Sequence, residues 1–208
     1  MIIAFCGPDG SGKTTHARLI YYTLASKGVR VKYIKFKAHH LTVYVILRIL
    51  QAFKVIPQTS CPAELDYNIA LKFSKARKLL LLLEHISAII WLLLNVKLPQ
   101  KYGYVIVAER YIPDFIVTLE FITMKNDQRS VILKLLRPFI EDAKIICLYA
   151  EPKLLVKRKT YEKIPLSYAK YLVSRYKAIA KEFSIALIDT TSRNIYEVHK
   201  AIVNLVLS

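Results

Sequence analysis

The sequence predicts an α/β fold in which helices cover both faces of a five-stranded parallel sheet. Short apolar segments alternate along the 208 residues with longer segments that have helical spacing, and this alternation is typical of strand–helix–strand units. The first apolar segment, residues 2–6, is continuous rather than alternating, as expected for a strand that is buried on both faces. We therefore expect three layers, helix–sheet–helix, in a single domain spanning residues 1–208.

The other elements follow from the same two patterns. The segment at residues 29–36 alternates like a strand, and Gly28 before it is suited to end a helix because glycine readily adopts left-handed dihedral angles. Pro152 is suited to begin a helix, since proline is tolerated in the first turn. Further strands are expected at 102–108, 144–150 and 185–188. Helices are expected at 13–27, 41–53, 63–78, 79–94, 112–124, 130–137, 166–183 and 195–207.

The composition indicates a folded chain with a large positive charge. Apolar residues make up 54% and charged residues 23% of the sequence, which excludes intrinsic disorder. The formal net charge of +17 is compatible with anionic small substrates, nucleic acid or a membrane surface. Because the basic residues are spread along the chain, the charge alone does not choose among these partners.

Cysteine usage favours a cytoplasmic protein. Cys6, Cys61 and Cys147 are widely spaced and odd in number, without the paired spacing of a metal site. Cys6 and Cys147 lie in apolar segments, where free buried thiols are expected. The first expected strand begins at residue 2, so we also expect no signal peptide.

A leucine-rich segment at residues 79–94 requires separate consideration. It contains Glu84 and His85 and is shorter than the ~20 residues that a helix needs to span a bilayer. We interpret it as a core or interface helix rather than a membrane span. Its outer face is a candidate contact in a homodimer, since a helix that is apolar on all sides must be buried by something.

A glycine-rich loop joins the first expected strand to the first expected helix. Gly7 is followed, after four residues, by Gly12-Lys13-Thr14, which fits the phosphate-binding pattern G-x-x-x-x-G-K-[ST]. Glycines let backbone N–H groups converge on one phosphate, and the helix N-terminus attracts the same anion. In this pattern Lys13 neutralises the outer phosphates and the Thr14 hydroxyl binds Mg²⁺. The alternative is an ordinary strand–turn–helix corner.

A second candidate site follows the strand expected at 102–108. Glu109 lies at the carboxyl end of that strand and would face the same crevice as the glycine-rich loop. Its carboxylate is suited to hold Mg²⁺ through water or to orient a phosphate acceptor. Arg110 offers a bidentate fork for a phosphate. A structural ion pair that caps the strand is the alternative interpretation.

These motifs, taken in order, resemble those of the thymidylate kinase family. The loop GPDGSGKTT at 7–15 looks like its phosphate loop, and LKFSKAR at 71–77 is similar to its thymine-binding helix. Glu109-Arg110-Tyr111 is similar to its Asp-Arg-Tyr motif, and LVKR at 155–158 to the segment that enters its lid. IDT at 188–190 and EV at 197–198 are similar to its last strand and helix. The resemblance implies a P-loop NTPase fold with a short lid at about residues 151–165.

The resemblance implies Mg²⁺-dependent transfer of the ATP γ-phosphate to dTMP in nucleotide biosynthesis, with no nucleic-acid or membrane partner. By position, Asp9 would contact the sugar 3′-hydroxyl of the acceptor, Phe73 would stack on its base and Arg77 would hydrogen-bond the base edge. The implied catalytic residues are Lys13, Glu109, Arg110 and Arg158, and the implied metal ligands are Thr14 and Glu109. ATP would be bound by Gly7, Asp9, Gly10, Ser11, Gly12, Lys13, Thr14, Thr15 and Arg158. The acceptor would be bound by Asp9, Phe36, Lys37, His39, Phe73, Arg77, Arg110 and Tyr111.

Some positions depart from the family's pattern. Glu109 replaces the usual aspartate, and Gly10 stands where some members carry an arginine. Members with glycine there rely on a basic lid, for which the candidates are Arg158, Lys159 and Lys163. Lys37 or His39 would replace the arginine that binds the acceptor phosphate, although neither is a guanidinium fork.

The departures leave the acceptor open. Another nucleotide or a deoxynucleoside is an alternative to dTMP. A nucleic-acid-associated P-loop ATPase is a second alternative that the net charge permits, but the chain has no basic run interleaved with aromatic residues as in single-strand binders.

Overall fold

The computed structural model describes residues 1–36, 51–54, 77–123, 129–159 and 164–207. The helices expected at 41–53 and 63–78 lie largely outside these residues. So do four candidate site residues, which are Lys37, His39, Phe73 and Lys163.

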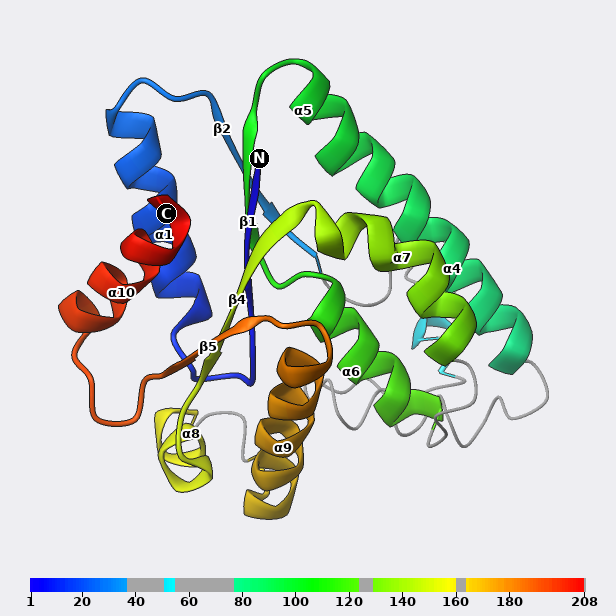
Figure 1. Cartoon of the computed structure of the whole chain (residues 1–208). Helices are drawn as coiled ribbons and strands as arrows, with labels where there is room; N and C mark the ends of the chain where they lie inside the picture. Colours follow the sequence, from blue (N-terminus) through cyan, green and yellow to red (C-terminus); the bar gives the residue numbers. More distant parts are fainter. Residues whose placement is uncertain (37–50, 55–76, 124–128, 160–163, 208) are drawn as a thin grey trace.

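Five parallel strands form one sheet in the order β2-β3-β1-β4-β5 (Figure 1). They are β1 (Ile2–Cys6), β2 (Val31–Lys35), β3 (Val105–Glu109), β4 (Ala143–Tyr149) and β5 (Ala186–Asp189). β1 occupies the centre, and all five of its side chains are buried, because strands and helices cover it on every side. Cys6 pairs in register with Cys147 of β4, and both are buried free thiols, as predicted. The predicted parallel α/β fold is thus confirmed.

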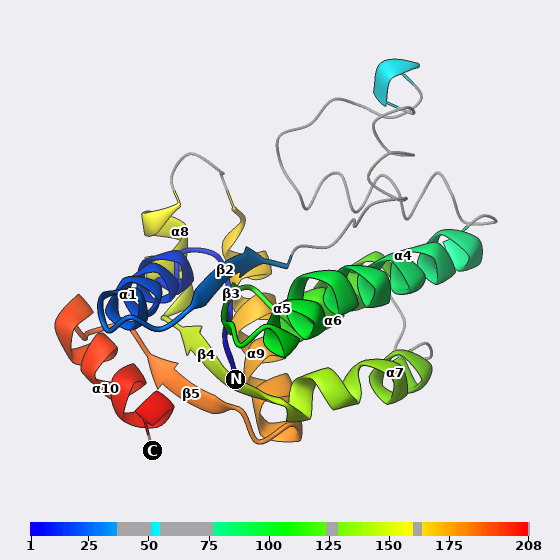
Figure 2. The same cartoon turned by 90° about the horizontal axis from the view of Figure 1, so that it is seen from above.

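Helices cover both faces of the sheet (Figure 2). On one face α1 (Lys13–Ser26) and α10 (Ile195–Leu207) pack through residues such as Ile20 and Ile202. On the other face α4 (Arg77–Leu92), α6 (Ile112–Thr123), α7 (Arg129–Glu141) and α9 (Leu166–Glu182) enclose a larger apolar cluster that includes Phe36 and Phe115. The short helix α8 (Pro152–Arg158) lies at the carboxyl end of the sheet, below β4 in Figure 1.

The leucine-rich helix is longer than predicted. α4 continues through a π-helical turn at Leu93–Lys97 into α5 (Leu98–Lys101), so the expected end near residue 94 is wrong. Pro99 lies in the first turn of α5, directly after the π-helical turn, and does not stop the helix. The helix ends at Lys101, and Gly103, two residues later, has a φ of 79° that suits glycine after a helix. The following strand consequently begins at Val105 rather than at residue 102.

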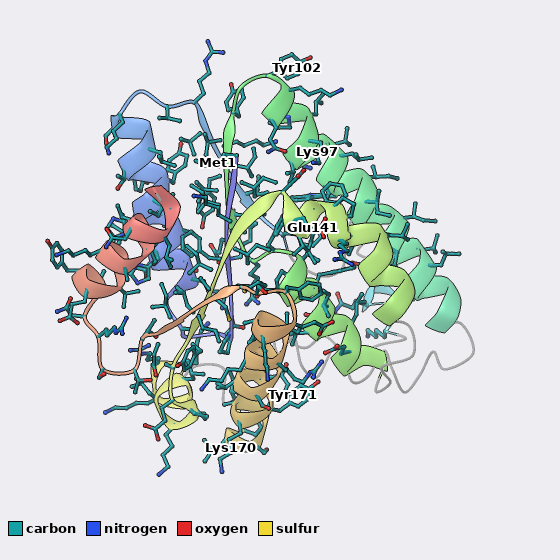
Figure 3. All side chains as sticks on the ribbon, in the orientation of Figure 1. Met1, Lys97, Tyr102, Glu141, Lys170 and Tyr171 are labelled. Carbon is teal, nitrogen blue, oxygen red and sulfur yellow. The ribbon has the colours of Figure 1, made fainter. Side chains whose placement is uncertain are left out.

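Helix α7 also extends further than predicted. It ends at Glu141 rather than at residue 137, although Pro138 lies inside it. The side chain of Lys97 forms an ion pair with Asp142, just after α7. Figure 3 labels Lys97 on the π-helical turn and Glu141 at the end of α7.

One face of α4 and its continuation is buried and the opposite face is exposed and apolar. Glu84, Ser87, Ala88, Leu92 and Val96 point into the domain. The exposed face carries large apolar side chains that are 45–56% exposed, namely Leu82, Ile86, Ile90, Leu93, Leu94 and Leu98. We call these six residues the apolar stripe. Leu82–Lys101 is long and apolar enough to cross a membrane by length and composition alone, with a mean hydropathy of 1.4, and 28% of it is buried.

Candidate phosphate-binding site

The glycine-rich loop curls between β1 and α1 as the motif predicts. Gly7, Gly10 and Gly12 all have positive φ angles, of 133°, 85° and 95°. At Gly7 a Cβ atom would lie 2.0 Å from the carbonyl oxygen of Leu148 in β4, so only glycine fits. Gly12 caps α1 without a side-chain hydrogen bond. The N–H groups of the first turn therefore remain available to an anion.

The Lys13 side chain is held inside the curve of this loop. Its Nζ donates hydrogen bonds of 2.7 Å to the carbonyl oxygens of Gly7 and Pro8 and lies 3.4 Å from Oδ1 of Asp9. Burial and the nearby charge of Arg110 lower the pKa of Lys13, whereas Asp9 opposes this shift. A buried side-chain amine thus lies within the loop whose amides would bind a phosphate.

Arg110 and Asp9 form an ion pair at the edge of the loop. Arg110 follows β3 with a φ of 64°, a strained conformation for a residue with a side chain. Burial alone would raise the pKa of Asp9, but the charges of Lys13 and Arg110 lower it to about 2. Asp9 is consequently ionised at neutral pH and able to accept a hydrogen bond from a hydroxyl group.

Two further residues hold Arg110 in place. Its Nη1 lies 3.4 Å from Oδ1 of Asp114, which also accepts a 2.9 Å hydrogen bond from the Tyr176 hydroxyl. Burial raises the pKa of Asp114, and Arg110 and Lys13 counteract the shift. We did not predict Asp114 or Tyr176 as site residues. The signal for Asp114 was its position four residues after Arg110 at the start of a helix.

Glu109 lies next to Thr14 and is engaged by three side chains. Its Oε1 accepts a 2.8 Å hydrogen bond from the Thr14 hydroxyl and pairs with Lys35, and its Oε2 accepts a 2.5 Å hydrogen bond from the Tyr33 hydroxyl. Burial alone would raise the pKa of Glu109, but these donors lower it to about 2. A hydroxyl and an ionised carboxylate are the hard oxygen ligands that Mg²⁺ prefers, so this pair fits a magnesium ion.

Tyr33 and Lys35 were not predicted as site residues. Their signal was the two-residue period of β2, which puts both side chains on one face of the strand. Lys35 is paired in register with Glu109. The ion pair that we considered for Glu109 therefore exists, but its partner is Lys35 and not the neighbouring Arg110.

The last turn of α8 lies over the loop. Arg158 donates hydrogen bonds of 3.1 Å to the carbonyl oxygens of Gly10 and Thr190. A Cβ atom on Gly10 would lie 3.4 Å from Cγ of Lys159 and 3.5 Å from Cβ of Arg158. A side chain at position 10 would therefore contact Arg158 and Lys159 at the end of α8.

Two candidate acceptor-binding side chains lie in the core instead. Phe36 and Tyr111 are fully buried. The Phe36 ring packs against Trp91 and Phe115 at centroid distances of 5.2 and 5.6 Å, and the Tyr111 hydroxyl donates a 3.3 Å hydrogen bond to the carbonyl oxygen of Phe139. Their aromatic rings serve packing in this structure, and their contact with the acceptor stays a prediction.

Other candidate residues lie at or near the loop. Thr15 is exposed in the first turn of α1. Ser11 is buried and accepts, through its carbonyl oxygen, a 3.3 Å hydrogen bond from the Thr190 hydroxyl. Arg77 begins α4, and its side chain lies outside the described part of the chain.

Comparison with models of known protein families finds no match, and comparison with curated proteins finds none either. Among solved structures, the chain is similar to deoxyadenosine kinase from M. mycoides with bound dATP. The similarity covers 100% of both chains with a TM-score of 0.56 and a sequence identity of 14%. The chain therefore shares its parallel α/β fold with a nucleoside kinase.

Proposed function

We propose that this protein is a P-loop kinase that transfers the γ-phosphate of ATP to a nucleotide or nucleoside, with dTMP as the first candidate acceptor. The observation that carries the proposal is the placement of the Arg110–Asp9 pair against the loop that holds Lys13. A site that only bound a nucleotide would need the loop alone. A transferase also needs groups for the second substrate beside it.

The charges suit phosphoryl transfer, which depends on positioning and on neutralising charge. Lys13 lies under the expected position of the outer phosphates, and Arg110 lies at the side where an acceptor would approach. The Arg158 guanidinium bonds the carbonyl oxygen of Gly10 in the same loop. Three cations from three separate elements thus surround the place where the transferred group would pass.

Thr14 and Glu109 would hold the Mg²⁺ of the nucleotide. The ion would neutralise phosphate charge during transfer. The protein's own contribution is to keep the carboxylate ionised, which the three donors to Glu109 achieve.

Two observations favour particular acceptors. The resemblance to thymidylate kinases favours dTMP, and the concentration of cations around Asp9 suits an acceptor that carries a phosphate of its own. Phe73, Arg77, Lys37 and His39 remain the proposed contacts to its base and phosphate. A deoxynucleoside is the second candidate, because the similar solved structure is a deoxyadenosine kinase.

A coupled assay of ADP release tests the proposal. The purified protein is incubated with Mg-ATP and with dTMP, other monophosphates or deoxynucleosides in turn. We expect acceptor-dependent ADP release that is highest with dTMP. ADP release that needs DNA and ignores every small acceptor would instead indicate the nucleic-acid-associated ATPase.

We further propose a cytoplasmic homodimer that associates through the apolar stripe. An exposed apolar surface along one helix is typical of a protein–protein contact.

Replacing Ile90 and Leu94 together by glutamate should give a monomer in size-exclusion chromatography with light scattering. Tyr196→Glu, at a residue of α10 that is 74% exposed, is the matched control and should leave the dimer intact. A monomeric wild-type protein at micromolar concentration would contradict the dimer.

A further inference from the structure

Glu109 contacts both Thr14, at the start of α1, and Lys35, on the edge strand β2. Its side chain is 5% exposed, whereas that of Lys35 is 43% exposed. Oε1 of Glu109 is shared between the Lys35 ammonium and the Thr14 hydroxyl. The ammonium therefore lies beside the same two oxygen ligands that fit a magnesium ion.

We propose that Lys35 is an internal counter-cation that occupies the metal position of this site and leaves it when Mg²⁺ arrives with the nucleotide. This inference rests on the proposed function, because it assigns Thr14 and Glu109 to the metal. A buried carboxylate needs a positive partner, and in the described structure Lys35 supplies it. The metal would supply it in the loaded site.

The two cations exclude each other on electrostatic grounds. A divalent ion bound to Oε1 would lie within a few ångströms of the ammonium, in a partly buried environment where repulsion is weakly screened. Lys35 has a flexible four-carbon side chain at the end of an edge strand, so its ammonium can move into solvent while the backbone stays in place. Displacement is consequently possible without any change in the sheet.

The other two partners of Glu109 do not compete in this way. Thr14 and Tyr33 are neutral donors, and the Thr14 hydroxyl can rotate to present its oxygen to a metal. Tyr33 donates its hydrogen bond to Oε2 of Glu109, not to Oε1, and orients the carboxylate. Among these three residues, only Lys35 opposes the binding of a bare metal ion. Metal binding therefore depends on the nucleotide, which brings further ligands and negative charge for the metal.

The test measures binding of Mn²⁺ in the absence of nucleotide and acceptor. The electron paramagnetic resonance signal of the free ion reports how much Mn²⁺ remains unbound. Mn²⁺ takes the same carboxylate and hydroxyl ligands as Mg²⁺. We expect weak binding to the wild-type protein and at least about tenfold tighter binding to Lys35→Met. Glu109→Gln added to Lys35→Met should abolish the gain. Lys32→Met is the matched control, because Lys32 lies on the same strand but bonds Asn95, and it should bind Mn²⁺ like the wild type.

Unchanged Mn²⁺ affinity in Lys35→Met, or a gain that survives Glu109→Gln, would overturn the inference. Circular dichroism verifies that each variant is folded, and Lys35→Gln replaces Lys35→Met if the latter is not. The outcome is separate from that of the proposed function. A gain in a protein that transfers no phosphate would refute the function alone, and phosphate transfer without a gain would refute the inference alone.

Discussion

Replacing Lys13 by alanine is expected to lower kcat for phosphoryl transfer by about 10²- to 10³-fold while leaving the fold intact. The lysine is the only cation that the described structure places inside the curve of the loop. Charge on the transferred phosphate changes during the reaction, so losing this cation should affect the transition state more than ATP binding. Steady-state kinetics should therefore show a large change in kcat and a smaller change in the KM for ATP.

Lys27→Ala is the matched control for Lys13→Ala. Lys27 follows the carboxyl end of the same helix and is exposed, so its loss should leave kcat unchanged. Circular dichroism and thermal unfolding would show whether Lys13→Ala remains folded, since two carbonyl groups lose their donor. Near-wild-type turnover of folded Lys13→Ala would refute the assignment of the loop.

Gly7→Ala should destabilise the protein by roughly 3 kcal/mol or more. The added Cβ would overlap the carbonyl oxygen of Leu148 at 2.0 Å, and that oxygen belongs to a central strand that cannot move freely. The φ of 133° adds backbone strain for any residue with a side chain. Urea unfolding of the wild type and the variant measures the difference in the free energy of unfolding.

Gly28→Ala measures the cost of a positive φ without the steric overlap that Gly7→Ala introduces. Gly28 also has a positive φ, of 76°, but a Cβ there would meet no atom within 4 Å. The same substitution should therefore cost only about 1–2 kcal/mol for the left-handed conformation. If the two variants lost equal stability, close packing of Gly7 against β4 would not be what requires glycine.

The sequence was sufficient to predict the sheet and the loop because both depend on local patterns. The continuous apolar residues of β1 indicated a central strand, and the glycine spacing before Lys13 indicated the phosphate-binding loop. The end of the leucine-rich helix was not predictable in this way. A π-helical turn and a proline in a tolerated position let the helix continue to Lys101, and neither feature has a strong sequence signal.

The motif residues of the candidate site were predicted from the sequence, whereas the residues that pair with them were not. Lys13, Thr14, Glu109 and Arg110 were expected from motifs, and the structure brings them together at the carboxyl ends of β1 and β3. Lys35 was missed because its role depends on which strand lies beside β3, and a sequence pattern does not contain strand order. The burial of Phe36 in the core was not predictable either, since its position in a motif does not say which face of the sheet its side chain occupies.

The most direct test of the central claim is to follow the labelled γ-phosphate of [γ-³²P]ATP. We predict that the label appears on the nucleotide or nucleoside acceptor, in an amount equal to the ADP formed. Recovery of the label only as inorganic phosphate, whatever acceptor is supplied, would contradict the account, because the loop would then serve hydrolysis rather than transfer.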